Sequence, residues 1–462
     1  MSETKAAPAK ASSLVKRSAI VAAIGGLIFG FDTAVISGTT TALEAKFDLS
    51  SSGLGFTVAI ATIGTILGAL VAGNLADRLG RRKVLFIIGC LYLLGALGTG
   101  LAPTHVVLLI FRFIGGIGVG MSSVVAPIYT AEISPAAVRG RLVGLVQFNI
   151  VLGILVAYAS NAGIRKIFDD DVAWRWMLGV MAIPAVIFLL LLAFVPETPR
   201  WLFDNGKDAE ATRVSRALCN SQEESDMQIA EIRKQMAEDA AVAGAHIPFF
   251  TKRYRKPILM AFLIAMFNQL SGINAILYYA PVVMQQAGAS EDSSYLMSIA
   301  VGLMNLVATM IALTVIDRLG RRQLMIVGSL GYLISLGFLA VVMFKYEGHF
   351  NSTSSVLVLI GLLVFIAAHA FGQGSVIWVF ISEIFPNRVR GRGQSLGSMT
   401  HWVFAALTTY AFPPMIDGLG GGTAFLFFFL FMGGQLFWVL KVMPETKGIP
   451  LEEMESRLGL SQ

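Results

Sequence analysis

The sequence predicts an all-α protein that crosses a membrane many times and is built from two six-helix halves. Three observations lead to this fold class: a low content of charge, a series of long apolar runs, and a set of charged phrases that occurs twice. Of 462 residues, 55% are hydrophobic and only 14% are charged, whereas soluble domains carry about 25% charged residues. This composition is typical of a polytopic membrane protein.

The apolar runs are long enough to cross a bilayer. A hydrocarbon core about 30 Å thick requires about 20 apolar residues per helix. Twelve such runs begin near residues 18, 54, 84, 106, 142, 176, 257, 296, 323, 356, 394 and 423. Only helices and closed barrels satisfy their backbone hydrogen bonds in lipid, so continuous runs of this length predict twelve transmembrane helices.

The positive charges between the runs predict the orientation. Lys and Arg concentrate in the connections after the second, fourth, eighth and tenth runs and just before the seventh, and they are sparse in the intervening connections. Cytoplasmic loops carry an excess of Lys and Arg. We therefore expect both termini and the basic segments to be cytoplasmic, in a protein of the cell membrane. Charges confined to short loops do not indicate nucleic-acid binding.

A polar insert divides the chain into two halves. It covers residues 197–256, between an N-terminal six-helix bundle in 1–196 and a C-terminal six-helix bundle with a short tail in 257–462. The insert contains "KDAEATRVSRAL" and "EESDMQIAEIRKQMAEDAAV", whose pattern predicts short amphipathic helices. We expect them to lie in the cytoplasm as a tether, and a regulatory role is left open.

Three charged phrases occur once in each half. "DRLGRR" at 77–82 recurs at 317–322, "EISPAAVRGR" at 132–141 returns as "EIFPNRVRGR" at 383–392, and "PETPR" at 196–200 returns as "PETKG" at 444–448. An even number of predicted spans separates the copies, so both copies of each phrase face the same side. This predicts two halves related by an axis along the membrane normal.

The repeated phrases predict a latch at the cytoplasmic ends of the helices. Carboxylates and guanidinium groups form charge-assisted contacts there, each worth about 0–1 kcal/mol at a wet surface, which suits a contact that opens in every cycle. The alternative is that these charges only set topology, but topology counts Lys and Arg and does not require repeated acids. The predicted latch residues are Asp77, Arg78, Arg82, Glu132, Arg139, Glu197 and Arg200, with Asp317, Arg318, Arg322, Glu383 and Arg390.

Several motifs together resemble the sugar porter family of the major facilitator superfamily. They are "GGLIFGFDTAVISG" at 25–38, "GNLADRLGRR", "RFIGGIGVG" at 112–120, "PETPRWL", "NQLSGINAILYYAP" at 268–281 and "SEIFPNRVRGR", in the family's order over about residues 18–455. The resemblance implies the twelve-helix major facilitator fold. It also implies a sugar held near the midplane between two halves that expose it to each side in turn.

Two opposite charges within the spans predict a buried pair. Asp32 lies about eight residues from the outer end of the first run and Arg112 about seven from the outer end of the fourth, which places both about 10–12 Å deep. Ionisable residues inside a membrane are functional candidates. A nearby guanidinium favours the charged carboxylate and burial favours the neutral one. We therefore expect rocking of the halves to change the distance between Asp32 and Arg112 and so to bind or release a proton. The alternative is a static pair. The resemblance favours coupling, because bacterial proton-linked sugar porters carry Asp at this position and facilitative relatives a neutral residue.

Amide and aromatic side chains at mid-bilayer depth predict a site for a neutral polyol, whose hydroxyls require donors and acceptors in a dry pocket. A single Asn or Gln often joins helices instead, and Trp often lies at the membrane interface, but the cluster as a whole favours a binding site. In sugar porters the matching positions bind a hexose or pentose. The predicted residues are Gln147, Asn268, Gln269, Asn274, Tyr278, Asn305, His369, Gly374, Trp378, His401 and Trp402.

Some of these positions depart from the family pattern. Asn268 stands where many relatives have Gln, His369 where an aromatic residue is usual, His401 where Asn or Gln is common, and Ser375 where Pro is frequent. The changes keep hydrogen-bonding capacity but alter shape, so the sugar is left open among glucose, xylose, fructose, galactose and inositol. His401 is expected to be a neutral hydrogen-bonding group, with pH sensitivity as the alternative.

The sequence thus predicts a proton-coupled symporter that imports a monosaccharide, and a monomer with no cofactor or metal. A facilitative sugar or polyol uniporter is the closest alternative, and a non-transporting sugar sensor is a further one. An enzyme is not expected, because "GQSLG" at 393–397 lacks the strand and turn that a nucleophile elbow requires. "RFIGGIGVG" has no preceding strand, so Gly116 and Gly120 are expected to allow close helix packing.

Overall fold

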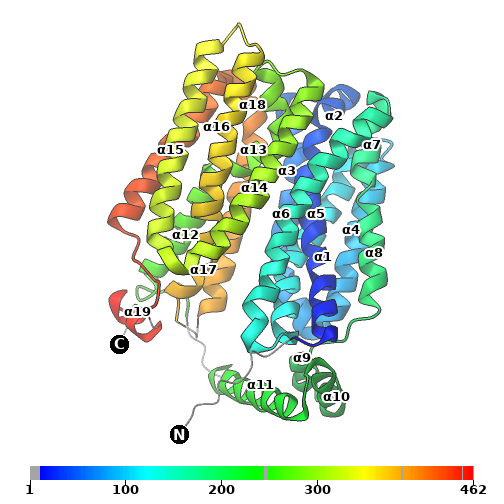
Figure 1. The fold of residues 1–462 in the computed structure, drawn as a ribbon, viewed down its shortest axis with the longest axis vertical. Coiled ribbons are helices and arrows are strands. Elements are labelled where there is room, and N and C mark those ends of the chain that lie inside the picture. The colour runs from blue at the N-terminus through cyan, green and yellow to red at the C-terminus, as the bar shows by residue number, and fades with distance from the viewer. Residues whose placement is uncertain (1–10, 244–247, 387–388, 450, 461–462) are drawn as a thin grey trace.

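The computed structural model describes residues 11–243, 248–386, 389–449 and 451–460. These residues form helices and no β-strands. Figure 1 shows two bundles standing side by side, with the N-terminal half of the chain in one and the C-terminal half in the other. The prediction of an all-α protein in two helical halves is confirmed.

The first bundle is formed by eight helical segments with an added 3-10 turn. Its fifth and sixth crossings are α6 and the stacked pair α7 and α8. The segments are α1 (Ser13–Val35), η1 (Ile36–Gly38), α2 (Thr40–Phe47), α3 (Ser51–Leu79), α4 (Arg81–Gly100), α5 (His105–Ile133), α6 (Ala136–Ile167), α7 (Asp170–Gly179) and α8 (Ala182–Leu192).

The second bundle repeats this arrangement with two interrupted helices. Its first crossing is α12 with α13, and a π-helical turn, η2, joins α16 to α17. The segments are α12 (Arg255–Leu270), α13 (Ile273–Gln286), α14 (Glu291–Leu319), α15 (Arg321–Tyr346), α16 (Ser352–His369), η2 (Ala370–Gly374), α17 (Ser375–Ile384) and α18 (Arg390–Lys441).

The last segment, α18, crosses the membrane twice. Its 52 residues would extend about 78 Å as one straight helix, more than twice the thickness of a bilayer core. The chain reverses at Gly420, whose φ of 79° and ψ of 156° are not helical, and glycine adopts this backbone region without steric cost. Together with the ten preceding long helices, α18 completes the twelve crossings that the sequence predicts.

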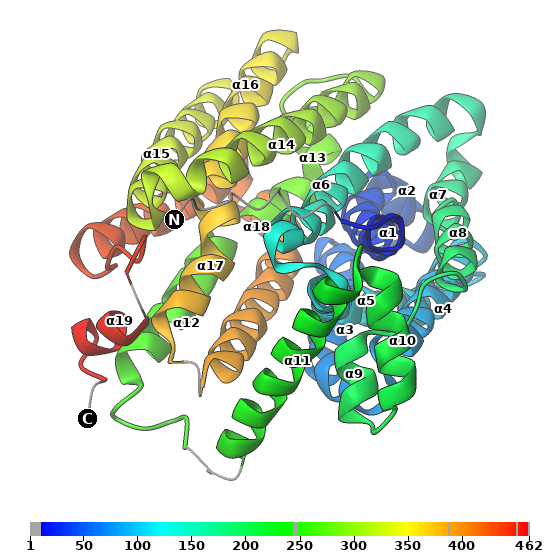
Figure 2. The ribbon, with the colours of Figure 1, turned by 60° about the horizontal axis from the view of Figure 1, so that its bottom comes forward.

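The two ends of the bundles differ. Helices α9 (Pro199–Asp204), α10 (Asp208–Leu218), α11 (Gln222–Ala243) and α19 (Leu451–Arg457) lie at one end, which we call the linker end. Figure 2 shows α9 and α10 beneath the first bundle, with α11 running beside them. The opposite end, which carries α2 and α7 (Figure 1), is called the distal end.

Glycines allow α5 to lie against the backbone of α3. A Cβ on Gly116 would overlap the carbonyl group of Ala61, and one on Gly120 would overlap that of Thr65. The residues of "RFIGGIGVG" therefore lie inside α5 at a helix contact, as expected for close packing in a membrane. They do not form a phosphate-binding loop.

Candidate transport site

A pocket lies between the two halves. The first half contributes residues of α1 and α6, and the second contributes residues of α12 to α14, α16, η2 and α18. The lining consists of Phe29, Thr33, Gln147, Ile150, Val151, Ile154, Asn268, Gln269, Ile273, Asn274, Leu277, Tyr278, Asn305, Thr309, His369, Ala370, Gly374, His401 and Trp402.

The structure brings all the predicted sugar-site residues to this pocket except Trp378. Trp378 is 38% exposed, and its ring centroid lies 5.2 Å from that of His401, which lines the pocket. Its assignment assumed α-helical spacing after Gly374. The four-residue spacing from Gly374, the N-cap of α17, to Trp378 runs along α17, after the π-helical turn over Ala370–Gly374, and the role of Trp378 at the site stays a prediction.

A break in the seventh crossing presents four polar side chains to the pocket. Helix α12 ends at Leu270, and Gly272, with φ of 88°, precedes α13. Asn268 and Gln269 therefore lie in the last turn of α12. Asn274 and Tyr278 lie one turn apart on α13 and share a face, and both line the pocket. The predicted spacing of Asn274 and Tyr278 holds because the break comes before both residues.

Hydrogen bonds orient the polar lining. Gln269 Nε2 donates to Asn268 Oδ1 at 3.0 Å and lies 3.1 Å from Nε2 of His401. Tyr332 Oη lies 2.6 Å from Nδ1 of His369. Oε1 of Gln269 is buried and has no hydrogen-bond partner. An unpaired buried acceptor is costly, and a hydroxyl-bearing ligand would satisfy it.

Aromatic and small side chains missed by the sequence analysis complete the pocket. Phe29 of the first half lies 6.0 Å from Trp402 of the second, measured between ring centroids. Thr33 and Thr309 add hydroxyls, and Thr33 directly follows Asp32. Phenylalanine and threonine are common in apolar helices, so no pattern in a single sequence marks these two positions.

Asp32 and Arg112 form the buried pair that their depths predict. Oδ1 of Asp32 lies 3.0 Å from Nη1 of Arg112, and their side chains are 8% and 4% exposed. Nε of Arg112 is buried without a partner. Both residues belong to the first half, on α1 and α5. Rigid rocking of the halves therefore leaves their separation unchanged, contrary to the expectation that rocking itself would vary it.

The second half nevertheless reaches this pair. Tyr158 of α6 donates to the carbonyl of Leu277 on α13 at 2.6 Å, and the next residue, Tyr278, lies close enough to Asp32 and Arg112 to feel the charge of both. Tyr278 also lines the pocket. A movement of α13 against the first half would therefore alter both the pocket and the surroundings of the carboxylate.

At the linker end, one arginine in each half is the centre of an ion-pair network. Nη2 of Arg81 lies 3.0 Å from Oε1 of Glu132, and its Nη1 lies 3.0 Å from Oδ1 of Asp77. Glu197 accepts hydrogen bonds from the backbone N–H groups of Arg81 and Arg82. Thr198 donates to Glu132 at 2.6 Å. These contacts tie the ends of α3, α4 and α5 to the segment between α8 and α9 within the first half.

The second half repeats most of this network. Nη2 of Arg321 lies 2.9 Å from Oε1 of Glu383. Thr446 donates to Glu383 at 2.6 Å, and Glu445 accepts from the backbone of Arg321 and Arg322. Sequence reasoning missed Arg81, Arg321, Glu445 and the two threonines. The signal was present, because each lies in a phrase that occurs twice.

The two equivalent carboxylates, Glu197 and Glu445, differ in burial, and their pKa values shift in opposite directions. Burial raises the pKa of Glu197 above that of an ordinary glutamate, and backbone N–H donors oppose the shift. Glu445 is more exposed. Burial also raises its pKa, but hydrogen bonds from the backbone of Lys447, Arg321, Arg322 and Thr446 lower it further, so the net shift is downward. The acid of the first half therefore takes up a proton at higher pH than its counterpart.

The side chains of several other predicted latch residues are placed differently. Arg78 and Arg318 are exposed, and Arg139 donates to the carbonyl of Ser134 at 3.4 Å. Nε and Nη2 of Arg390 are buried without a hydrogen-bond partner, and the side chain of Asp317 lies outside the described residues. Arg82 and Arg322 instead donate to carbonyls near the ends of α8 and α18, those of Leu192, Ala193, Val439 and Leu440.

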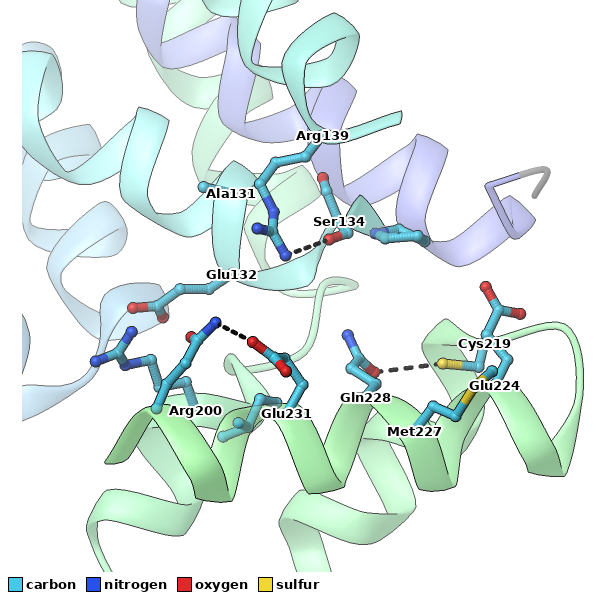
Figure 3. A pocket seen from close by; sticks show the side chains of 13 residues that line it. Ala131, Glu132, Ser134, Arg139, Arg200, Cys219, Glu224, Met227, Gln228 and Glu231 are labelled. Carbon is cyan, nitrogen blue, oxygen red and sulfur yellow. Dashed lines mark hydrogen bonds between the residues drawn. The ribbon is translucent and has the colours of Figure 1, made fainter. Parts of the chain in front are cut away.

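A second pocket lies at the linker end. Figure 3 shows it between the C-terminal end of α5 and the linker helix α11. Three predicted latch residues, Glu132, Arg139 and Arg200, line it together with Cys219 and Gln228. The linker helix α11 therefore lies against the end of the first bundle.

Contacts between the halves are found at the distal end. Arg165 of α6 forms ion pairs with Glu291 and Asp292 of α14, and its guanidinium lies 5.2 Å from the ring centroid of Tyr295. Tyr295 donates to the carbonyl of Gly38 at 2.6 Å. These contacts hold the distal ends of the two bundles together.

Replacing Arg165 with alanine is expected to favour opening of the distal end. The lost ion pairs are partly exposed and worth about 1 kcal/mol together, which is about a fivefold change in the population of the open form. Spin labels at the exposed positions Thr41 and Leu419 should report a longer mean distance. Lys46→Ala, which removes an exposed cation at the same end, should leave the distance unchanged. Equal distances in Arg165→Ala and the parent would refute the role of these contacts.

Comparison with known proteins agrees with this architecture. The family model described as "Sugar (and other) transporter" matches residues 18–458. The chain belongs to this sugar transporter family. The match covers both halves and the linker, which makes the protein a multi-pass membrane transporter and not an enzyme.

Relatives in this sugar transporter family align over nearly the whole chain. The D-xylose-proton symporter of Escherichia coli (strain K12) is 34% identical over 487 residues, covering 96% of each chain. The glucose transporter GlcP of Staphylococcus epidermidis is 33% identical over 440 residues, covering 95% of this chain and 96% of its own length.

The solved structure of the E. coli xylose transporter XylE in a partially occluded inward-open conformation superposes with a TM-score of 0.83. It is 32% identical, and the match covers 95% of this chain and all of that one. A second XylE structure, described as a proton:xylose symporter of the major facilitator superfamily bound to 6-bromo-6-deoxy-D-glucose, gives a TM-score of 0.79 at 33% identity. That match covers 96% of this chain and 99% of the other. The major facilitator fold is thereby confirmed.

Proposed function

We propose that the protein is a proton-coupled symporter that imports a monosaccharide by alternating access. The observation that carries the proposal is the joint position of an amide-lined pocket between the halves and a buried Asp32–Arg112 pair beside it. The names of the relatives, which include xylose, arabinose and glucose carriers, support a hexose or pentose as the cargo.

The pocket suits a neutral polyol. Amides of both halves, such as Gln147 and Gln269, supply donors and acceptors for hydroxyls, while Phe29 and Trp402 supply apolar faces for a sugar ring. Because both halves contribute, rocking one against the other exposes the pocket first to one side and then to the other. A bound sugar contacts both halves and draws them together, so the rocking motion depends on whether the pocket is occupied.

Tyr278 links the proton to the sugar. Asp32 is paired with Arg112 at 3.0 Å. When α13 moves with the second half, the Tyr278 hydroxyl moves relative to the pair, and water gains or loses access to the carboxylate. Asp32 then takes up a proton on one side and releases it on the other. Sugar occupancy and proton transfer are coupled because the same helix takes part in both.

The conformation of the structure, with the distal ends of the halves joined, supports transport toward the cytoplasm. Arg165 and Tyr295 join the halves at the distal end, and the basic segments lie at the linker end. We place the linker end in the cytoplasm by the excess of Lys and Arg in those segments. The protein is then a monomer in the cell membrane, and this structure is closed to the outside. The ion-pair networks around Arg81 and Arg321 brace each half at its cytoplasmic end.

The alternative is a facilitative uniporter, and one observation favours it. Asp32 and Arg112 lie on helices of the same half, so the pair can serve as a fixed brace between α1 and α5. A static pair would leave sugar movement independent of the proton gradient. The dependence of sugar uptake on that gradient therefore separates the two functions.

Uptake by proteoliposomes tests the proposed function. Labelled xylose, arabinose, glucose, galactose, fructose and inositol are supplied with and without an inward proton gradient. A symporter accumulates at least one monosaccharide only when the gradient is present. Gradient-independent equilibration would identify a uniporter, and binding without uptake would identify a sensor.

A further inference from the structure

A chain of five buried polar side chains runs from the pocket to the far side of the second bundle. Gln269 Nε2 donates to Asn268 Oδ1 at 3.0 Å, and Asn268 Nδ2 lies 3.5 Å from Gln373 Oε1. Gln373 Nε2 donates to Gln435 Oε1 at 2.6 Å, and Gln435 Nε2 donates to Ser329 Oγ at 2.8 Å. The five residues belong to α12, η2, α18 and α15, and each is at most 2% exposed.

All the amides in this chain point in the same direction. Each amide donates through its nitrogen to the next residue, and the Ser329 hydroxyl is the final acceptor. All the amide oxygens except that of Gln269 accept from the preceding amide. A side-chain amide has one acceptor end and one donor end, so reversing one member would set two donors or two acceptors against each other. The orientation of each amide is therefore tied to that of its neighbours.

The end of the chain at the pocket is open. Gln269 lines the pocket, its nitrogen is used by Asn268 and by His401, and its Oε1 is buried with no partner. Gln373, Gln435 and Ser329 lie outside the pocket lining. The chain thus fixes which end of the Gln269 amide remains available to a ligand, through residues that do not touch that ligand.

We propose that Gln373, Gln435 and Ser329 are positioning residues that set the hydroxyl specificity of the site. Through Asn268 they hold Gln269 with its oxygen free, so the subsite takes a ligand hydroxyl as a donor. This inference rests on the proposed function for the identity of the occupant, a monosaccharide. A site built to bond one hydroxyl discriminates strongly against an analogue that lacks it, and here that discrimination depends on a serine on another helix.

The test uses two serines on the same helix. Ser329→Ala removes the final acceptor of the chain. Ser335→Ala is the matched control, because Ser335 is equally buried on α15 but donates only to the carbonyls of Gly331 and Tyr332. Equilibrium binding to the purified full-length protein is measured for the sugar that binds most tightly and for each of its monodeoxy analogues. Gln269→Leu serves as the reference for loss of the subsite.

In the parent protein and in Ser335→Ala, one monodeoxy analogue should bind about tenfold or more weakly than the sugar itself. In Ser329→Ala the ratio of the affinity for the sugar to the affinity for that analogue should fall to about its value in Gln269→Leu. The corresponding ratios for the other deoxy analogues should stay at their parent values. Gln435→Met, which removes the link without changing the length of the side chain, should give the same selective loss. It replaces Ser329→Ala if that variant does not fold.

A parent-like ratio in Ser329→Ala or Gln435→Met would overturn the inference, because the amide would then hold its orientation without the chain. An equal loss of affinity for all analogues would also overturn it, since that is what a purely structural role produces. A parent protein that binds no sugar in the panel would instead refute the proposed function.

Discussion

Replacing Asp32 with asparagine is expected to abolish sugar accumulation while leaving exchange intact. Asparagine keeps the size of the side chain and can still accept a hydrogen bond from Arg112, so the helix contact between α1 and α5 is retained. It carries no titratable proton, so no proton crosses with the sugar. In proteoliposomes with an inward proton gradient, the ratio of internal to external sugar should fall to one.

Exchange of labelled for unlabelled sugar should continue at a rate within a few-fold of the parent. Asp48→Asn is the matched control, because Asp48 is an exposed acid at the distal end and asparagine tolerates its left-handed backbone, with φ of 50°. That variant should accumulate sugar normally. Accumulation by Asp32→Asn would show that the pair is a brace and that coupling lies elsewhere.

Replacing Gln269 with leucine should raise the KM for the sugar by about 10- to 100-fold, or about 1.4–2.8 kcal/mol. The substitution removes a hydrogen-bonding group from the pocket and also leaves Asn268 Oδ1 without its donor. Both effects raise the KM. The sugar loses a hydrogen-bonding group, and a buried polar atom left unpaired costs about 1–3 kcal/mol. The maximal rate should change much less than the KM.

Gln285→Leu provides the control for this substitution. Gln285 lies on α13, and its amide donates to Ser294 at 3.1 Å, outside the pocket lining. The KM of the Gln285→Leu variant for the sugar should stay within about twofold of the parent value, which corresponds to less than about 0.5 kcal/mol. Initial rates over a range of sugar concentrations measure both variants. A parent-like KM in Gln269→Leu would remove this residue from the binding site.

The fold follows from the sequence because the bilayer imposes few solutions. Apolar length sets the number of crossings, and the repeated phrases set the relation of the halves, so both could be predicted without contacts. The spacing of Asp32 and Arg112 from the ends of their runs predicts equal depth, and the two side chains meet at 3.0 Å. The number of crossings and the depth of a residue in the membrane depend on distance along the helix axis, so spacing in the sequence is enough to predict them.

Features set by side-chain direction were harder to predict. Arg81, and not Arg78, faces Glu132, although both arginines belong to the same phrase, because Gly80 separates α3 from α4 and changes the direction of the chain. Trp378 lies outside the pocket lining, although it follows Gly374 by one helical turn. Gln373 and Gln435 were visible as amides in apolar runs, but their alignment with Asn268 depends on how three helices pack.

Sugar-driven proton movement tests the central claim most directly. Proteoliposomes containing the protein and a pH-sensitive dye receive a pulse of the transported sugar, with no gradient imposed beforehand. The account predicts acidification of the interior in the parent protein and none in Asp32→Asn, although sugar enters both. Sugar entry into parent proteoliposomes with no proton movement at any pH would contradict it.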